Sequence, residues 1–155
     1  WLHERPYRLD ALLARGPALS RRDPETYWSL VGEVWTDSEN IWQNLPAWQR
    51  LWRSTARGRV HAMDEEEREA LAALPEAVTV FRGVRDAGFA PGLAWTTDRD
   101  KAVWFARRWK QAHLAPKLLT GRIDRSRIRA HFLGRGESEV VALRQDVTLL
   151  NAETP

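Results

Sequence analysis

The 155-residue chain contains no cysteine. Disulfide bonds, a thiolate nucleophile and cysteine-ligated zinc are therefore excluded, because each of them requires a cysteine sulfur. This absence fits a reducing compartment, and we expect a cytoplasmic protein, either in the cell that makes it or in a target cell. The four histidines are scattered without the spacing of metal ligands, so we also expect no metal site.

Long hydrophobic runs are also missing. No stretch approaches the roughly 18 apolar residues that a membrane-spanning helix needs, so the sequence predicts no membrane partner. Residues 1–5 do not show the layout of a signal peptide, in which a charged segment precedes an apolar one. The GxGxxG, GxxxxGK(S/T), HExxH and GxSxG motifs are absent, which excludes the nucleotide-binding, zinc-protease and serine-hydrolase sites that depend on them.

Net charge is low, but the charges are unevenly distributed. The chain has 24 Lys and Arg residues and 21 Asp and Glu residues, which leaves a net charge of +3. Residues 99–129 contain ten basic and two acidic residues, whereas residues 64–76 contain six acidic residues and one basic residue. The basic segment can attract phosphate groups, but a solvated, arginine-rich helix face explains it equally well.

Helix start signals dominate the first half of the chain. Asp23 and Pro24 are typical of an N-cap followed by the first residue of a helix. Pro46 opens a later helix, and Asp64 with Glu67 has the spacing of a capping box. These signals predict a mainly helical N-terminal part.

The residues before this first capped helix are expected to be irregular. Pro6, Gly16 and Pro17 interrupt any long helical pattern there, because proline and glycine disfavour the interior of a helix. We therefore expect an arm with one short helix over Leu9–Ala14.

After Pro75 the pattern changes from helices to strands. Runs rich in β-branched and aromatic residues predict strands over 78–81, 93–96, 117–123, 128–132, 137–143 and 147–150. One helix, capped by Thr97 or Asp98, interrupts them. Helices followed by strands predict an α+β protein. We expect a single domain over residues 1–155, with a helical layer at 1–74 and a β-rich core at 75–155.

Tryptophan is unusually abundant, with nine residues, five of which fall within residues 28–52. We expect them to fill the helical layer, because large aromatic side chains bury much apolar area. A docking face or a set of base-stacking platforms is the alternative. Trp104 is an exception, because it lies on the side of its helix opposite the apolar stripe of Ala102, Phe105 and Trp109. It must meet a second layer, a ligand or solvent.

Two segments carry polar groups at the ends of predicted strands. Val80–Gly83 places Arg82 where its planar guanidinium can bind a phosphate, and Gly83 lets a ligand approach the backbone. Trp95–Asp98 provides hydroxyl groups at a strand-to-helix junction. Taken alone, a charged strand end and a helix cap explain these residues without a function.

A third segment, Gly136–Val141, contains two glutamates at the start of a predicted strand. Glu137 and Glu139 are two residues apart, so both side chains are expected to point into one cleft. A solvated edge strand is the structural explanation for this pattern. The combination of the three segments, in this order, is more specific than any one of them.

An arginine ending a first strand, hydroxyls after a second and Glu-x-Glu beginning a late strand resemble the ADP-ribosyltransferase family. The match is to its arginine–serine–glutamate type, shared by bacterial toxins and phage-borne enzymes. It covers about residues 78–143 and implies a split, mostly antiparallel β-sandwich after the helical layer, with residues 75–155 as the catalytic core. Thr96 stands where the family has its first serine, and Asp98 stands where a second serine is common.

The resemblance implies that NAD is the substrate and that ADP-ribose passes to an acceptor when the nicotinamide–ribose bond breaks. It implies that Glu139 stabilises the positive charge that develops on the ribose, and that Glu137 orients or deprotonates the acceptor. It also implies that Arg82 binds the phosphates or the ribose of NAD, and that Thr96 holds Glu139 in place. A protein is the expected acceptor, with arginine favoured by the glutamate at position 137, and a nucleic acid is the alternative.

Further NAD contacts are expected around these residues. Gly83 and Thr97 lie beside the arginine and the first hydroxyl, and the nicotinamide is expected to stack on Trp95, Trp104 or Phe105. Of these three rings, Phe105 is also the best candidate for a plain core position. The glycine-containing turn over residues 132–136 looks like the family's mobile turn for acceptor recognition.

Two other functions stay open. The same cleft could hydrolyse NAD as an NAD-depleting glycohydrolase, although such an enzyme has no need of the second carboxylate of Glu137. A non-enzymatic module could instead bind nucleic acid through the basic segment and exposed tryptophans, or bind a protein through the tryptophan-rich helices.

Overall fold

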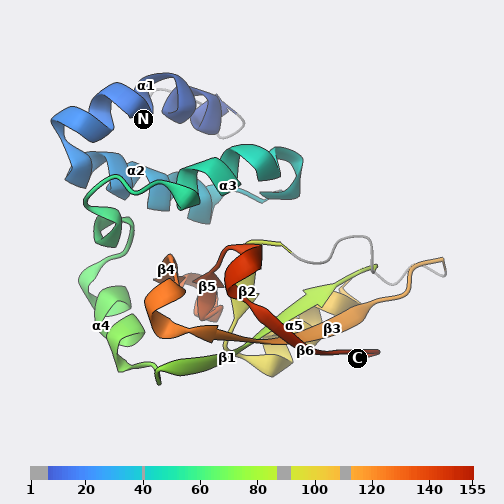
Figure 1. Cartoon of the computed structure of the whole chain (residues 1–155). Coiled ribbons are helices and arrows are strands. Elements are labelled where there is room, and N and C mark those ends of the chain that lie inside the picture. Colours follow the sequence, from blue (N-terminus) through green and yellow to red (C-terminus); the bar gives the residue numbers. More distant parts are fainter. Residues whose placement is uncertain (1–6, 40, 87–91, 109–112) are drawn as a thin grey trace. The chain divides into compact units, whose positions relative to one another are not determined.

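The computed structural model describes residues 7–39, 41–86, 92–108 and 113–155. It divides into two compact units, Trp1–Arg68 and Glu69–Pro155, which we call the helical unit and the sheet unit and describe one at a time. Figure 1 shows the helices of the first unit and the strands of the second, which together confirm the predicted α+β class. Within the described ranges, no helix is long and apolar enough to cross a membrane.

The described part of the helical unit contains three helices, two short 3-10 turns and the beginning of a fourth helix. These are α1 (Arg8–Arg22), α2 (Pro24–Asp37), Ile41–Asn44, α3 (Leu45–Arg53), Arg59–Ala62 and α4 (Glu65–Ala73). The predicted start of α2 is confirmed, because the Asp23 carboxylate accepts hydrogen bonds from the hydroxyl and the backbone N–H of Thr26. Those two bonds, the hydroxyl first, hold the pKa of Asp23 below its ordinary value.

The prediction of an irregular N-terminal arm is wrong, because α1 runs as one helix through Pro17. A proline inside a helix removes one backbone hydrogen bond and costs about 3 kcal/mol. Packing against α2 offsets that cost. Leu9 and Leu12 are buried, and Gly16 lies so close to α2 that an added Cβ would be 2.8 Å from the Tyr27 ring.

Tryptophan side chains fill the helical unit. Trp28, Trp35, Trp48 and Trp52 are each at most 2% exposed. Trp35 packs edge-on against Trp48 and Trp52, with ring centroids 5.0 and 5.6 Å away, which is a favourable geometry for aromatic pairs. The fifth tryptophan of this stretch, Trp42, is 56% exposed, so the expected core role is confirmed for four of the five.

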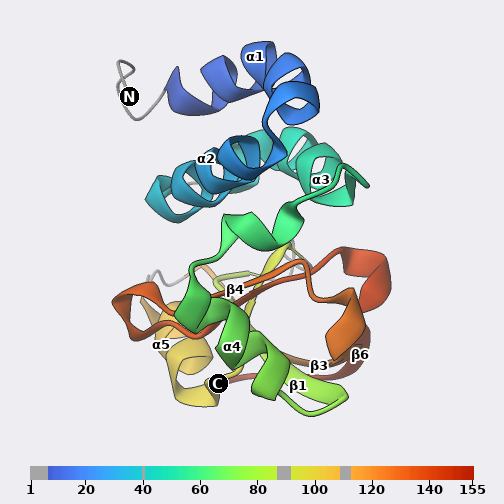
Figure 2. The ribbon, with the colours of Figure 1, turned by 90° about the vertical axis from the view of Figure 1, so that its left-hand side faces the viewer.

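The boundary between the units lies at Arg68, earlier than the expected end of the helical layer at residue 74. α4 starts with the predicted capping box, in which Asp64 and Glu67 each accept a hydrogen bond from the other's backbone N–H. Its last part belongs to the sheet unit, and Leu71 and the following Leu74, just beyond the end of the helix, pack against the core of that unit. Figure 2 shows α4 leading into the first strand. That the two units form a single domain stays a prediction.

The described part of the sheet unit contains one antiparallel sheet of six strands. They are β1 (Ala77–Val84), β2 (Ala94–Thr96), β3 (Lys117–Asp124), β4 (Ala130–Phe132), β5 (Glu139–Val141) and β6 (Thr148–Glu153). Their order is β4-β5-β2-β1-β3-β6, and the sheet is open, with β4 and β6 at its edges. A strand is present at each predicted place, with ends that differ by a few residues.

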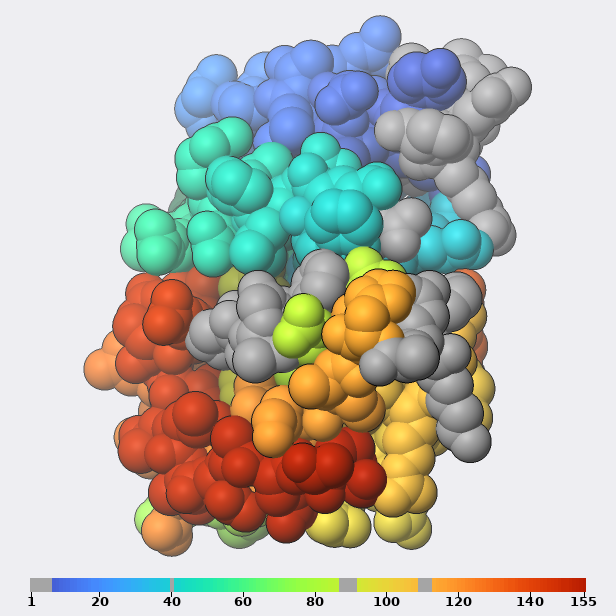
Figure 3. Space-filling view, turned by 90° about the vertical axis from the view of Figure 1, so that its right-hand side faces the viewer, coloured from blue at the N-terminus to red at the C-terminus, as the bar shows by residue number. Residues whose placement is uncertain are grey.

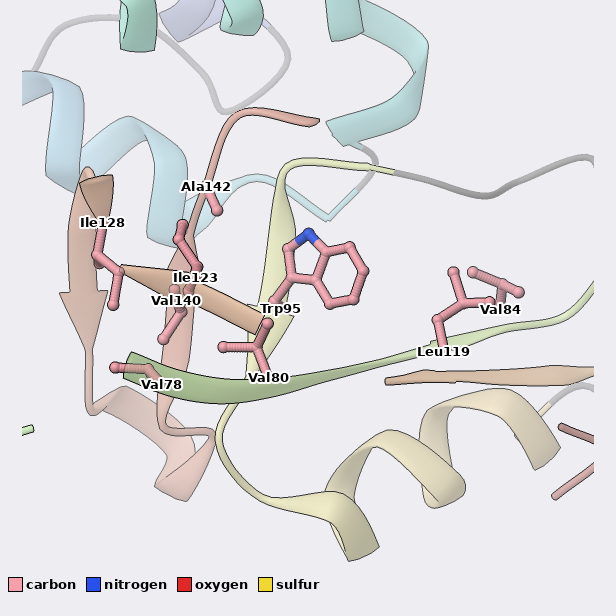
Figure 4. Close-up of a cluster of buried hydrophobic side chains, with 9 residues drawn as sticks. All are labelled: Val78, Val80, Val84, Trp95, Leu119, Ile123, Ile128, Val140 and Ala142. Carbon is pink, nitrogen blue, oxygen red and sulfur yellow. The ribbon is translucent and has the colours of Figure 1, made fainter. Parts of the chain in front are cut away.

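The two faces of β1 are covered differently. One face contributes Val78, Val80 and Val84 to a cluster of nine buried residues. The other six members are Trp95, Leu119, Ile123, Ile128, Val140 and Ala142. The other face of β1 is turned toward α5 (Arg99–Arg107), whose predicted cap is confirmed because Asp98 accepts from the N–H groups of Asp100 and Lys101. Figure 4 shows the cluster on one side of β1 and this helix on the other.

β6 forms an edge of the sheet and lies at the molecular surface (Figure 3). Leu149 and Leu150 on this strand are 56% and 57% exposed. An ion pair between Arg99 of α5 and Glu153 of β6, 2.8 Å long, links the helix to the edge strand.

Candidate functional site

Strand pairing brings the three predicted segments together. Thr96, the last residue of β2, lies opposite Phe81 of β1 on one side and opposite Glu139 of β5 on the other. Glu139 in turn lies opposite Phe132 of β4. Directly opposite residues of antiparallel strands point to the same face of a sheet, so these four side chains form one row.

Hydrogen bonds connect the hydroxyl segment to the glutamate segment. The Thr96 hydroxyl donates to the Glu137 carbonyl at 2.8 Å and accepts from the Asp98 N–H at 3.0 Å. The Thr97 N–H donates to the Ser138 carbonyl at 3.2 Å, and the hydroxyls of these two residues are 2.5 Å apart. Thr96 thus holds the backbone just before the strand of the second glutamate. Its expected bond to the carboxylate of that glutamate stays a prediction.

The prediction that Glu137 and Glu139 share one face of a strand is wrong. β5 begins only at Glu139, and Glu137 has helical backbone angles, with φ −88° and ψ −13°. Ser138 between them has φ +40°. The alternation of side chains requires an extended backbone, which these two residues do not have. Glu139 therefore belongs to the sheet and Glu137 to the turn before it, and both side chains are partly exposed.

Arg82 lies with its guanidinium against the start of β2. Its Nη1 donates to the Ala94 carbonyl at 2.7 Å, and a Cβ added at Gly92 would be 2.8 Å from the same nitrogen. Its Nε is buried and has no hydrogen-bond partner among the described residues.

The charge of Arg82 interacts with that of Glu139. Burial lowers the pKa of Arg82 well below its ordinary value, to about 10, and the negative charge of Glu139 partly offsets this decrease. Arg82 therefore remains a cation at neutral pH. A strongly shifted pKa produced by burial together with a specific charged partner is common at functional sites.

At two of the expected NAD contacts, protein atoms occupy the nearby space. Gly83 lies against the backbone of α5, where an added Cβ would be 2.6 Å from the Ala106 nitrogen. Trp95 is 3% exposed within the core cluster, and its indole N–H donates to the Gly92 carbonyl at 3.2 Å. NAD contacts by Gly83 and Trp95 stay predictions.

Trp104 of α5 meets solvent and is 55% exposed. It packs edge-on against the half-buried Phe105, with ring centroids 5.1 Å apart. The guanidinium carbon of Arg108 lies 5.4 Å from the centre of the Trp104 ring. An exposed indole beside a cation suits the stacking of a nicotinamide or a nucleobase. Trp109, the other aromatic residue expected on this helix, lies outside the described residues.

No protein-family model, curated protein or solved structure matches this chain. Nor does the described part of the chain contain a group of three His, Cys, Asp or Glu residues that could hold a metal ion. The site consists of a partly buried cation, a carboxylate that interacts with it, and a turn held by two threonines.

Sequence reasoning missed Ser138 and Gly92. Ser138 bonds to Thr97, and the only available signal was a hydroxyl residue between the two glutamates. Gly92 leaves the space that the Arg82 guanidinium occupies. For that glycine the sequence indicates a turn, which does not show which side chain fills the space.

Proposed function

We propose that this chain is a mono-ADP-ribosyltransferase of the arginine–serine–glutamate type, with NAD as its substrate and a split antiparallel β-sandwich of the family's kind. The position of Thr96 supports the proposal most directly. Thr96 lies opposite Glu139, bonds to the Glu137 carbonyl and pairs with the strand that carries Arg82. The arginine, hydroxyl and glutamate elements of the proposed enzyme thus lie on three neighbouring strands.

In this proposal Arg82 binds a phosphate of NAD. The Nη1 atom bonds to a carbonyl, while the buried Nε keeps a donor without a partner in the described residues. Guanidinium groups bind phosphate through several N–H donors at once. A buried cation also attracts an anion more strongly than an exposed one does, because less water screens the two charges.

Glu139 stabilises the transition state. The bond between nicotinamide nitrogen and ribose carbon breaks, its electron pair leaves with the nicotinamide, and positive charge develops on the ribose. A carboxylate held by the sheet stabilises that charge without reorganising during the reaction. The acceptor nucleophile then forms a bond to the ribose carbon, and Glu137 takes the proton that it loses. The position of Glu137 in the turn, outside the sheet, suits contact with a second substrate.

Nicotinamide release from NAD tests the proposal. We expect the parent protein to release nicotinamide when a cell lysate supplies acceptors, and Glu139→Gln to reduce the rate by at least about 100-fold. Glu69→Gln, at an exposed carboxylate of the same unit, is the matched control and should leave the rate unchanged. No release by the parent, or equal rates for parent and Glu139→Gln, would refute the proposed activity.

The same assay separates transfer from hydrolysis. A transferase releases nicotinamide faster with lysate than without it, whereas an NAD glycohydrolase gives equal rates in both conditions. With NAD labelled in the adenosine part, a transferase also leaves label on a macromolecule. Digestion of that product with protease or with nuclease identifies a protein or a nucleic-acid acceptor.

A second candidate function, binding of single-stranded nucleic acid, is favoured by the exposed Trp104 ring beside Arg108. Bases stack on exposed aromatic rings, and phosphates attract cations. This function predicts binding of an oligonucleotide that weakens steeply with salt and is lost in Trp104→Ala. Trp42→Ala, at a tryptophan of similar exposure in the helical unit, is the control.

A further inference from the structure

The six-residue turn 133–138 between β4 and β5 has an unusual backbone. Arg135, Gly136 and Ser138 have φ values of +59°, +65° and +40°. Only one of the three is a glycine, the residue that adopts this left-handed region without steric conflict. The turn precedes Glu139 directly, so its conformation decides where that carboxylate lies.

The left-handed Ser138 is held by two hydrogen bonds to Thr97, the residue that directly follows β2. The Thr97 N–H donates to its carbonyl, and the two hydroxyls lie 2.5 Å apart. These partly buried hydroxyls bond to each other, so their hydrogen-bonding groups are used within the protein. A backbone conformation that is unfavourable by itself persists only where its surroundings fix it.

We propose that Ser138 and Thr97 are positioning residues, whose hydroxyl pair fixes the turn and thereby the carboxylates of Glu137 and Glu139. The inference rests on the proposed function, because it concerns the rate of NAD cleavage. Misplacing a reacting group by about 1 Å can reduce a rate by as much as 100-fold. Since the two hydroxyls bond to each other, their loss should change the rate of the chemical step and leave NAD binding nearly unchanged.

Steady-state kinetics of nicotinamide release test this inference with variants on both sides of the pair. Ser138→Ala and Thr97→Val each remove one hydroxyl, and we expect kcat to fall about tenfold with KM within about twofold of the parent. Thr97→Ser keeps the hydroxyl and should restore kcat to within about threefold of the parent. The double variant should lose little beyond either single one, because both remove the same interaction. Thr120→Val, at a half-buried threonine of β3, is the control.

Ser138→Gly separates positioning from stability. Glycine accepts a φ of +40° more easily than serine, so this variant should melt at the parent temperature or above it and still lose kcat. A rate that falls only when the melting temperature falls would overturn the inference. So would an unchanged kcat in Ser138→Ala, or a loss in Thr97→Ser as large as in Thr97→Val. If the parent itself released no nicotinamide, the proposed function would fail and this inference with it. An active parent with unaffected variants overturns the inference alone.

Discussion

The two units each hold one partly buried arginine, but with different partners. In the helical unit Arg8 bonds to the Asp37 carboxylate at 3.1 Å, and the interior is filled by four tryptophan rings. In the sheet unit the interior is mostly aliphatic, yet the unit buries the guanidinium of Arg82 at the cost of a lowered pKa.

Under the proposed function, we expect the helical unit to contribute mainly to stability and the sheet unit to bind the ligand. Burying a cation without full hydrogen bonding is unfavourable, and proteins retain such groups mainly where a function requires them. Aromatic rings packed edge-on stabilise a fold and leave no polar group for chemistry except the indole N–H. We therefore expect variants of the helical unit to affect folding first, and variants of the sheet unit to affect NAD cleavage first.

The largest stability effect should come from the tryptophan cluster. Trp35→Ala removes a ring that contacts both Trp48 and Trp52, and we expect a loss of about 3–5 kcal/mol in the free energy of unfolding. Denaturation followed by far-UV circular dichroism measures this loss. Trp42→Ala, at the exposed tryptophan, should cost less than about 1 kcal/mol. If folded Trp35→Ala also released no nicotinamide, the division of roles between the units would be wrong.

A glycine in each unit allows the two to be compared directly. A Cβ at Gly32 would collide with the backbone of Ala62, and a Cβ at Gly83 would collide with the backbone of Ala102. We expect Gly32→Ala and Gly83→Ala each to cost at least about 2 kcal/mol, because backbone cannot move aside as a side chain can. Gly134→Ala is the control, since a Cβ there meets nothing within 4 Å. Equal melting temperatures for all three variants would contradict this packing.

Arg82→Met should separate stability from activity. Methionine fills a similar volume without a charge, so we expect unchanged stability or a gain of up to about 3 kcal/mol, the free energy that corresponds to the lowered pKa of Arg82. Nicotinamide release should nevertheless be lost. The parent should gain stability relative to the variant above pH 10, where the folded arginine releases its proton before the unfolded one does. A destabilised variant that still cleaves NAD would show that Arg82 is structural.

The smallest effect concerns pH and His131 of β4. Burial holds the pKa of His131 below its ordinary value of 6.5. The histidine therefore binds a proton more weakly in the folded chain than in the unfolded chain. The contribution of neutral His131 to the free energy of unfolding is therefore complete above pH 6.5 and decreases as the pH falls below that value. Urea denaturation at several pH values should show a shallower fall for His131→Gln.

Several elements of both units follow from local sequence. The starts of α2, α4 and α5 were predictable, because Asp23, Asp64 and Asp98 bond to backbone groups two or three residues away. Strand positions were predictable from β-branched and aromatic runs such as Val78–Phe81. The exposure of Trp104 also agrees with its place opposite the apolar stripe of its helix.

Other features depended on partners far away in the sequence. The continuous α1 depends on the close approach of Gly16 to Tyr27, and the buried state of Arg82 depends on Gly92 and on Glu139. The separation of Glu137 from the strand of Glu139 follows from the turn that Thr96 and Thr97 hold. None of these contacts leaves a periodic signal along the chain.

The sequence by itself thus determined the α+β class, the helix starts and the three polar segments, because caps and alternation act between residues close along the chain. The tertiary structure alone decided that Thr96 lies between Phe81 and Glu139, and that the two glutamates have different surroundings. Strand order and hydrogen bonds across 41 residues of sequence set those positions. Such contacts form only when distant segments pack together, since their free energy depends on which groups become neighbours.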